Sequence, residues 1–123
     1  MPNQRIDLLE YRGNGSTAFT GRAEGKLARH NLNLSEKDKD GFVYDVIIPK
    51  NTTSINSSFF LGLFYESIKT LGSIEEFKKK YLFVIEEEDA EWKAILECNL
   101  AECCRRANNE LNHTTGIDFD FSL

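Results

Sequence analysis

The sequence has little of what builds metal centres, disulfide scaffolds or membrane spans. It contains two histidines, two prolines and three cysteines, and no run of about 18 apolar residues that could form a transmembrane helix. The N-terminal stretch MPNQRIDLLEYRG lacks the apolar region and cleavage site of a signal peptide. The cysteines cluster at Cys98, Cys103 and Cys104, and their odd number favours free thiols in a reduced compartment. We therefore expect a cytoplasmic protein that does not span a membrane.

Patterns typical of metal binding and catalysis are also missing. A zinc site needs three or four converging ligands, but there is no C-x-x-C pair, and the histidine nearest to Cys104 is His113. Buried free thiols on a core-facing helix are the favoured interpretation of the cysteines. No serine lies in a G-x-S-x-G elbow, and the single G-x-G segment lacks the third glycine of a phosphate loop. We expect no metal, no cofactor and no enzymatic activity. An enzyme of unrecognised type would have to use His30, His113 or Cys103.

The balance of charge narrows the class of partner. Acidic residues outnumber basic ones by 20 to 15, which gives a formal net charge of −5. Because affinity for duplex DNA depends on Lys and Arg, this balance argues against DNA binding. It is compatible with a basic protein partner. The length of 123 residues, with 41% apolar and 28% charged residues, predicts one globular domain over residues 1–123.

The segment from Gly41 to Gly72 organises the rest of the chain. Residues 42–48 are rich in β-branched and aromatic residues, which predicts a buried strand that ends before Pro49. Asn56-Ser57-Ser58 supplies side-chain oxygens that can cap a helix. A dense apolar run follows these residues and predicts a helix that ends at Gly72.

The remaining elements alternate between strands and helices. We expect strands at 4–11, 17–19, 81–85 and 117–123, helices at 21–29, 73–80 and 90–111, and a solvated loop at 32–40. Thr20 is expected to cap the first helix, and Ser73 with Glu76 forms a capping box. The continuous apolar run at 81–85 indicates a strand buried on both faces. Residues 112–116 break the last helix, so 112–123 is expected to be a terminal strand or tail. The order predicts an α/β fold with a partly parallel sheet.

Acidic residues gather directly after the strand at 81–85. They are Glu86, Glu87, Glu88, Asp89 and Glu91. If the strands at 43–48 and 81–85 are parallel, their carboxyl ends share one rim, which would bring residues 51–58 beside this acidic cluster. We expect the cluster, together with Asp118 and Asp120 in the tail, to bind a basic protein. A solvated helix entrance, favoured by the helix dipole, is the alternative.

With these elements placed, the chain resembles the STAS domain, and more closely the STAS-like family of unknown function. STAS proteins share a strand, a D-S-S-G-type turn and an amphipathic helix, and Ile55-Asn56-Ser57-Ser58-Phe59 corresponds to that turn. Gly21-Arg22-Ala23-Glu24-Gly25 resembles the Gly/Arg-containing helix of the STAS-like family, and Ser57-Ser58-Phe59-Phe60 resembles its S-S-F segment. The likeness covers roughly residues 19–106. It implies a STAS-like sandwich, with helices packed on a mixed, partly parallel sheet of about four or five strands.

The resemblance also implies an interaction module rather than an enzyme. In STAS regulators a partner kinase phosphorylates a serine of the turn, and the phosphate decides which protein binds. Matched residue by residue, Ser58 would be the acceptor, with Ser57 beside it and Asn56 in the place of the aspartate. Phe59 departs from the pattern because it replaces a glycine. A phosphate at a helix N-terminus is electrostatically favourable. The structural alternative is that Asn56, Ser57 and Ser58 only cap the helix.

Two functional hypotheses follow. The first is a small bacterial or phage-type protein that binds a partner, such as a kinase or another regulator, stoichiometrically and without turnover. The alternative is an immunity protein or antitoxin that neutralises a basic toxin, such as a contact-dependent growth inhibition nuclease. The acidity and small size of the chain favour this alternative. Both hypotheses predict a protein partner, and neither predicts binding to DNA or to a membrane.

Overall fold

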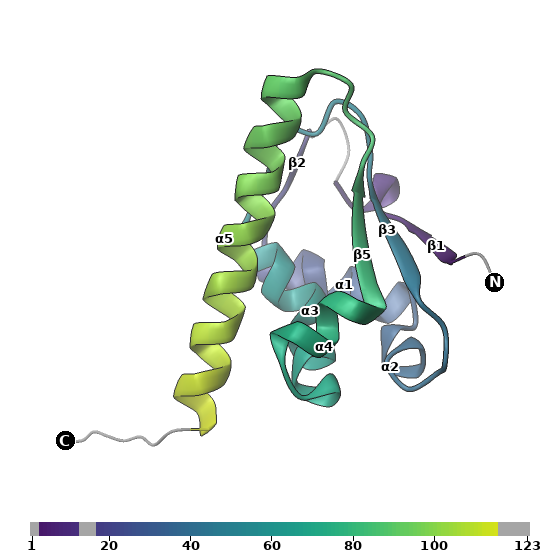
Figure 1. The fold of residues 1–123 in the computed structure, drawn as a ribbon, viewed down its shortest axis with the longest axis vertical. Helices are drawn as coiled ribbons and strands as arrows, with labels where there is room; N and C mark the ends of the chain where they lie inside the picture. The colour runs from purple at the N-terminus through teal and green to yellow at the C-terminus, as the bar shows by residue number, and fades with distance from the viewer. Residues whose placement is uncertain (1–2, 13–16, 116–123) are drawn as a thin grey trace.

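The computed structural model describes residues 3–12 and 17–115, and it combines helices with two small parallel sheets (Figure 1). The strands are β1 (Gln4–Asp7), β2 (Ala18–Phe19), β3 (Tyr44–Ile48), β4 (Ser54–Ile55) and β5 (Tyr81–Ile85). The helices are α1 (Arg22–Asn31), α2 (Leu34–Lys37), α3 (Ser57–Leu71), α4 (Ile74–Lys80) and α5 (Ala90–Thr115), and a 3-10 turn, η1, spans Leu9–Arg12. The chain is therefore an α/β protein, as the order of elements predicted.

The central strand of the larger sheet is β3. The strand order is β1-β3-β5 and every pair is parallel, with Val46 opposite Ile6 on one side and Phe83 on the other. This confirms the parallel alignment of β3 and β5. The second sheet pairs β2 with β4, so that Phe19 lies opposite Ile55. The structure thus has two parallel sheets where one mixed sheet was expected, because β2 pairs with β4 and not with β1.

Three boundaries in the first half of the chain differ from the expectations. The first strand ends at Asp7, whose side chain accepts a hydrogen bond from the Leu9 N–H and turns the chain into η1. The expected cap at Thr20 is wrong: α1 begins after Gly21, which has φ 90° and makes no side-chain cap. The expected loop at 32–40 contains α2, which the fully buried Leu34 anchors to the core.

The last helix is longer than expected. α5 continues through Asn112 to Thr115, so the predicted break lies within the helix. Its long exposed stretches make it polar overall, and no helix among residues 3–12 and 17–115 is apolar enough over sufficient length to cross a membrane. The predicted terminal strand at 117–123 lies outside the described residues.

The helix ends predicted in the middle of the chain are present. The Asn56 side chain accepts a hydrogen bond from the Ser58 N–H at 2.7 Å and caps α3. Gly72 ends the helix with φ 102°. The Ser73 Oγ accepts from the Glu76 N–H at 3.2 Å and caps α4. These local interactions fix the bounds of α3 and α4 as the sequence indicated.

Aromatic side chains from three elements form the centre of the core. Phe60 and Phe64 of α3 meet Phe77 of α4 and Phe83 of β5. The ring centroids of Phe64 and Phe77 are 5.0 Å apart, and those of Phe60 and Phe83 are 6.0 Å apart. Tilted and edge-to-face arrangements at such distances are favourable. This cluster attaches α3 and α4 to one face of β5.

The backbones of α1 and α3 are in direct contact where the two helices cross. A Cβ atom on Gly25 of α1 would lie 2.2 Å from the carbonyl oxygen of Phe59 in α3. A Cβ atom on Gly62 of α3 would lie 2.2 Å from the carbonyl oxygen of Arg22 in α1. Neither position has room for a side chain. The close packing explains why α1 contains a central glycine, despite a cost of about 1 kcal/mol relative to alanine.

A buried charged network holds α1 and α2 against the start of β5. Arg29 donates to Asp38 Oδ2 at 2.6 Å, to Ser67 Oγ at 2.7 Å and to the Leu63 carbonyl at 3.0 Å. The Tyr81 hydroxyl donates to the other oxygen of Asp38, Oδ1, at 2.6 Å. Burial, together with the hydrogen bond to the Asp38 carboxylate, raises the pKa of Tyr81. Because every charge has a partner, the network is a structural clamp.

A second network fixes the segment that enters β3. Lys80 Nζ donates to Asp40 Oδ1 at 2.8 Å and to the Phe42 carbonyl at 2.7 Å, and the Tyr44 hydroxyl donates to Asp40 Oδ2. Burial and this hydrogen bond raise the pKa of Tyr44 to about 12. Burial alone would raise the pKa of Asp40, but hydrogen bonds from Lys80, Tyr44 and the Phe42 N–H outweigh it and lower that pKa.

Replacing Gly25 by alanine should destabilise the protein. The added methyl group forces α1 and α3 apart, and we expect a loss of about 2–3 kcal/mol in the free energy of unfolding. Gly41→Ala is the matched control: its Cβ would meet nothing within 4 Å, and its effect should stay within about 0.5 kcal/mol. Urea denaturation of both variants measures the difference, and equal stabilities would contradict the close crossing.

Alkaline pH should weaken the fold partly through Tyr44. Its pKa is about 12 in the folded protein and about 10 when unfolded, so unfolding releases a proton in this window. The free energy of unfolding should therefore fall as the pH rises from 10 to 12. Tyr44→Phe should reduce this slope in denaturation curves recorded at pH 9, 10 and 11. An unchanged slope would show that the hydroxyl does not titrate as described.

Candidate protein-binding groove

The outer edge of β5 has backbone groups that face away from its partner strand. The Glu86 N–H donates to the Ile48 carbonyl at 2.9 Å, so by strand alternation the backbone groups of residues 82 and 84 also point towards β3. The N–H and C=O groups of Phe83 and Ile85 therefore point to the outer edge. β5 is the last strand of its sheet, and no strand of the described residues pairs with this edge.

The expectation that β5 is buried on both faces is wrong. Tyr81 is 1% exposed, whereas Leu82 and Val84 are 40% and 39% exposed. The reason is that α3 and α4 cover only the face that carries Tyr81 and Phe83. The apolar run YLFVI fits a strand buried on both faces and also an edge strand buried on one face, because the exposed residues of an edge strand can be apolar as well.

A groove separates β5 from α5. The helix runs alongside the strand but packs against α3 and β4 (Figure 1). Its fully or nearly buried side chains are Leu96, Leu100, Cys103, Cys104 and Ala107. The groove has a volume of about 540 Å³, with Tyr81 to Ile85 on one side and Leu100, Ala101 and Cys104 on the other. It is an apolar channel that runs along an unpaired strand edge.

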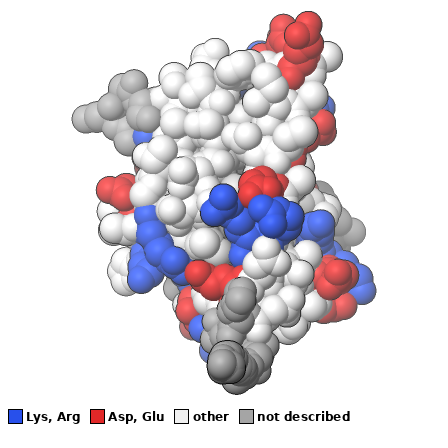
Figure 2. All heavy atoms as spheres, turned by 90° about the vertical axis from the view of Figure 1, so that its left-hand side faces the viewer, with Lys and Arg blue, Asp and Glu red and all other residues white. Residues whose placement is uncertain are grey.

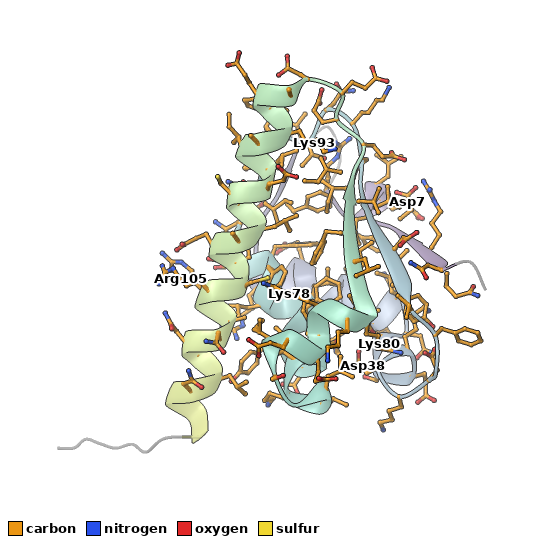
Figure 3. All side chains as sticks on the ribbon, viewed as in Figure 1. Asp7, Asp38, Lys78, Lys80, Lys93 and Arg105 are labelled. Carbon is orange, nitrogen blue, oxygen red and sulfur yellow. The ribbon has the colours of Figure 1, made fainter. Side chains whose placement is uncertain are left out.

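Two lysines border the groove at its two ends. Lys93 projects from the first half of α5 and Lys78 from α4 (Figure 3). Within the described residues neither lysine takes part in an ion pair. Glu97 also lines the groove, so its charged groups are two cations and one anion. Figure 2, which faces the outer side of α5, shows Lys and Arg gathered across the middle of that side, with acidic side chains at its upper end.

The thiols of α5 do not form a reactive centre. Burial raises the pKa of Cys103 to about 12, and burial also raises the pKa of Cys104, against a smaller opposing effect of Lys78. Both thiols are therefore uncharged near neutral pH. Cys98 is exposed, so the expectation of buried thiols holds for two of the three cysteines. Within residues 3–12 and 17–115, no group of His, Cys, Asp and Glu is placed to hold a metal ion.

The turn at Asn56, Ser57 and Ser58 forms the N-terminus of α3. Asn56 and Ser58 are exposed and Ser57 is half-buried. The hydrogen bond from the Ser58 N–H to Asn56 Oδ1 gives Asn56 a capping role. The predicted role of Ser58 as a phosphate acceptor stays a prediction. Its solvent exposure leaves the hydroxyl accessible to a kinase.

This turn and the acidic cluster do not share one rim, which corrects the expectation. Trp92 Nε1 donates to the Thr52 carbonyl at 2.8 Å, and further along α5 the Asn99 Oδ1 accepts from the Ile55 N–H at 3.0 Å. Trp92 and Asn99 are separated by about 10 Å of helix axis. β4 therefore leads the chain away from the carboxyl ends of β3 and β5, so that Asn56, Ser57 and Ser58 lie beside the middle of α5.

The acidic cluster itself lies at the carboxyl end of β5, as predicted. Glu88, Asp89 and Glu91 are exposed, and Glu86 and Glu87 are half-buried. Glu86 pairs with Arg5 at 3.3 Å and Glu88 with Lys50 at 3.2 Å. Exposed pairs of this kind contribute little to stability. The other two acidic residues predicted to bind a basic protein, Asp118 and Asp120, lie outside the described residues.

Sequence reasoning missed the residues that make the groove. None of Lys78, Lys93 and Ala101 was singled out as a site residue. Ala101 is exposed on the groove side of α5, and both lysines line the groove. The one sequence feature that could have indicated the groove is the apolar strand at 81–85 with Lys78 before it and Lys93 after it. These residues form a groove only if the strand lies at the edge of the sheet, and the sequence pattern does not specify the strand order.

Comparison of the chain with protein-family models, with curated proteins and with solved structures finds no match. The STAS-like resemblance therefore stays a prediction, and the groove is interpreted on its geometry and chemistry alone.

Proposed function

We propose that this chain is a non-catalytic protein-binding module that acts by stoichiometric binding, with the groove between β5 and α5 as its binding site. The observation that carries the proposal is the outer edge of β5, which opens directly into this groove. An extended segment of a partner can add to such an edge through main-chain hydrogen bonds. Side chains of the added segment then provide specificity.

The chemistry of the groove defines the partner segment. Leu100 and Cys104 offer apolar surface on the α5 side, which suits Leu, Ile or Phe side chains. Lys78 and Lys93 at the two ends favour acidic residues. A segment in which apolar and acidic residues alternate would turn its apolar side chains into the groove and keep its acidic side chains in solvent near the lysines of the rim, because alternate side chains of a strand point to opposite faces.

If the chain works as STAS regulators do, phosphorylation of Ser58 would control the binding of the partner. Ser58 is exposed at the N-terminus of α3, where added negative charge is favourable. Arg106 of α5 lines a polar hollow beside Ser57, together with Asn56, Asn99 and Glu102, and it pairs with Glu102 at 2.9 Å. A phosphate at this turn would therefore compete with Glu102 for Arg106, on the same helix that forms one wall of the groove.

The exposed acidic cluster supports a second candidate function, that of an immunity protein or antitoxin. Glu88, Asp89 and Glu91 project from one end of the molecule and could steer a basic toxin by charge complementarity. This candidate uses a surface separate from the groove. Variants of the two surfaces therefore distinguish it from the first proposal.

A groove-blocking variant tests the proposal. Ala101→Glu places a larger, charged side chain on the exposed groove wall and should reduce recovery of the bound protein by about tenfold or more. Ala23→Glu makes the same change at an exposed position of α1 and should leave recovery unchanged. The measurement is quantitative mass spectrometry of proteins captured from a native lysate by the wild type and by each variant.

Two further variants assign the surface. Joint replacement of Glu88, Asp89 and Glu91 by Gln should not affect a groove partner, but it should abolish capture of a basic toxin. Ser58→Ala should leave capture intact and remove any dependence on kinase treatment. Capture of one stoichiometric partner that is equal for wild type and Ala101→Glu would contradict the groove as the binding site.

A further inference from the structure

We propose that residues 117–123 of a second copy of this chain occupy the groove between β5 and α5, so that two copies associate by exchanging their tails. The inference deepens the proposed function and rests on the same groove. It concerns the sequence Ile117-Asp118-Phe119-Asp120-Phe121-Ser122-Leu123, which follows α5. Its alternating apolar and acidic residues are the pattern that the groove favours.

The alternation of the tail matches the two sides of the groove. Along a strand, Ile117, Phe119, Phe121 and Leu123 share one face, and Asp118, Asp120 and Ser122 share the other. Added to the outer edge of β5, the apolar face would continue the row of Tyr81, Phe83 and Ile85 and meet Leu100 and Cys104 across the groove. The polar face would continue the open face of the sheet. The acidic residues would therefore avoid burial.

The charges of the groove and the tail are complementary. Lys78 and Lys93 border the groove without ion-pair partners in the described residues. Asp118 and Asp120 are the only charged residues in the segment. Glu97 is the one acidic side chain in the groove lining, and it is exposed on α5. The tail thus brings two anions, on the open face of the sheet, to a groove whose rim carries an excess of positive charge.

Chain length decides between the same copy and a second copy. From Cys104, the last groove residue of α5, to Thr115 the helix axis extends about 16 Å away from the groove. A tail folding back on its own copy uses most of residues 116–123, about 26 Å when extended, to cover this distance. Only about three residues could then enter a groove that runs along five residues of β5. In a second copy the whole segment is available.

Reciprocal exchange makes a closed pair. Each copy supplies one tail and one groove, which is the arrangement of a two-fold symmetric dimer and leaves neither groove open. It also supplies hydrogen-bond partners for the outward groups of Phe83 and Ile85 and removes the free edge that would otherwise promote aggregation. A heterologous partner would have to displace the tail.

A mixing experiment with two complementary variants tests the exchange. The groove variant is Ala101→Glu, and the tail variant is Phe119→Ser with Phe121→Ser. In sedimentation-equilibrium ultracentrifugation the wild-type chain should dimerise, and each variant alone should have a dimer dissociation constant raised at least about tenfold. Mixed one to one, the variants should form a heterodimer through the one intact groove and the one intact tail. Ala23→Glu is the control and should dimerise as the wild type does.

Four results would overturn the inference: a monomeric wild type, a tail variant that still dimerises, a groove variant that still dimerises, or a mixture that stays monomeric. Thermal unfolding by circular dichroism checks that every variant is folded. A monomeric wild type whose protein capture is lost on Ala101→Glu overturns the inference and leaves the proposed function standing. Tail exchange without capture of any partner through the groove supports the inference and contradicts the proposed function.

Discussion

Hydrogen bonding along the outer edge of β5 is the constraint on which the rest of this account depends. Phe83 and Ile85 direct their N–H and C=O groups away from β3. Such unpaired backbone groups are a template on which another strand can form hydrogen bonds. Natural proteins protect such edges with short strands, charged side chains, bulges or a covering helix or loop. Here α5 passes beside the edge of β5 and leaves a groove of about 540 Å³.

The remainder of the fold holds this edge in place. The aromatic cluster of Phe60, Phe64 and Phe77 anchors the inner face of β5, and the Tyr81 hydroxyl fixes the start of the strand to the buried Asp38. On the opposite wall, the Trp92 and Asn99 side chains tie α5 to the segment around β4. Both walls of the groove are therefore rigid elements, so that little ordering is needed before a partner binds.

Local patterns were sufficient to predict α3, α4 and their caps. Asn56, Gly72 and Ser73 act within a few residues of their own positions, so the sequence contains the whole interaction. The parallel alignment of β3 and β5 followed from the intervening helices. The edge position of β5 could not be predicted in this way, because YLFVI fits a central strand and an edge strand equally well. A two-residue strand such as β4 is too short to show an alternating pattern. The sequence therefore did not reveal that β4 carries Asn56, Ser57 and Ser58 away from the acidic cluster, and the prediction of one shared rim was wrong.

Gly25 illustrates the same limit from another direction. Its sequence context indicates only a weakened helix, whereas the structure shows a backbone contact between α1 and α3 that depends on the missing side chain. The groove residues Lys78, Lys93 and Ala101 likewise acquire a role only when α4, α5 and β5 come together. Residue types indicated the elements, and tertiary packing decided which surface remains available to a partner.

Amide hydrogen exchange along β5, followed by NMR with the groove empty in the Phe119→Ser, Phe121→Ser variant and with the groove filled, tests the central claim most directly. The Val84 amide points to β3 and should be protected in both states. The Phe83 and Ile85 amides should exchange rapidly while the groove is empty and become protected when a strand fills it. Equal exchange of Phe83 and Ile85 in the two states would show that binding does not occur at this edge.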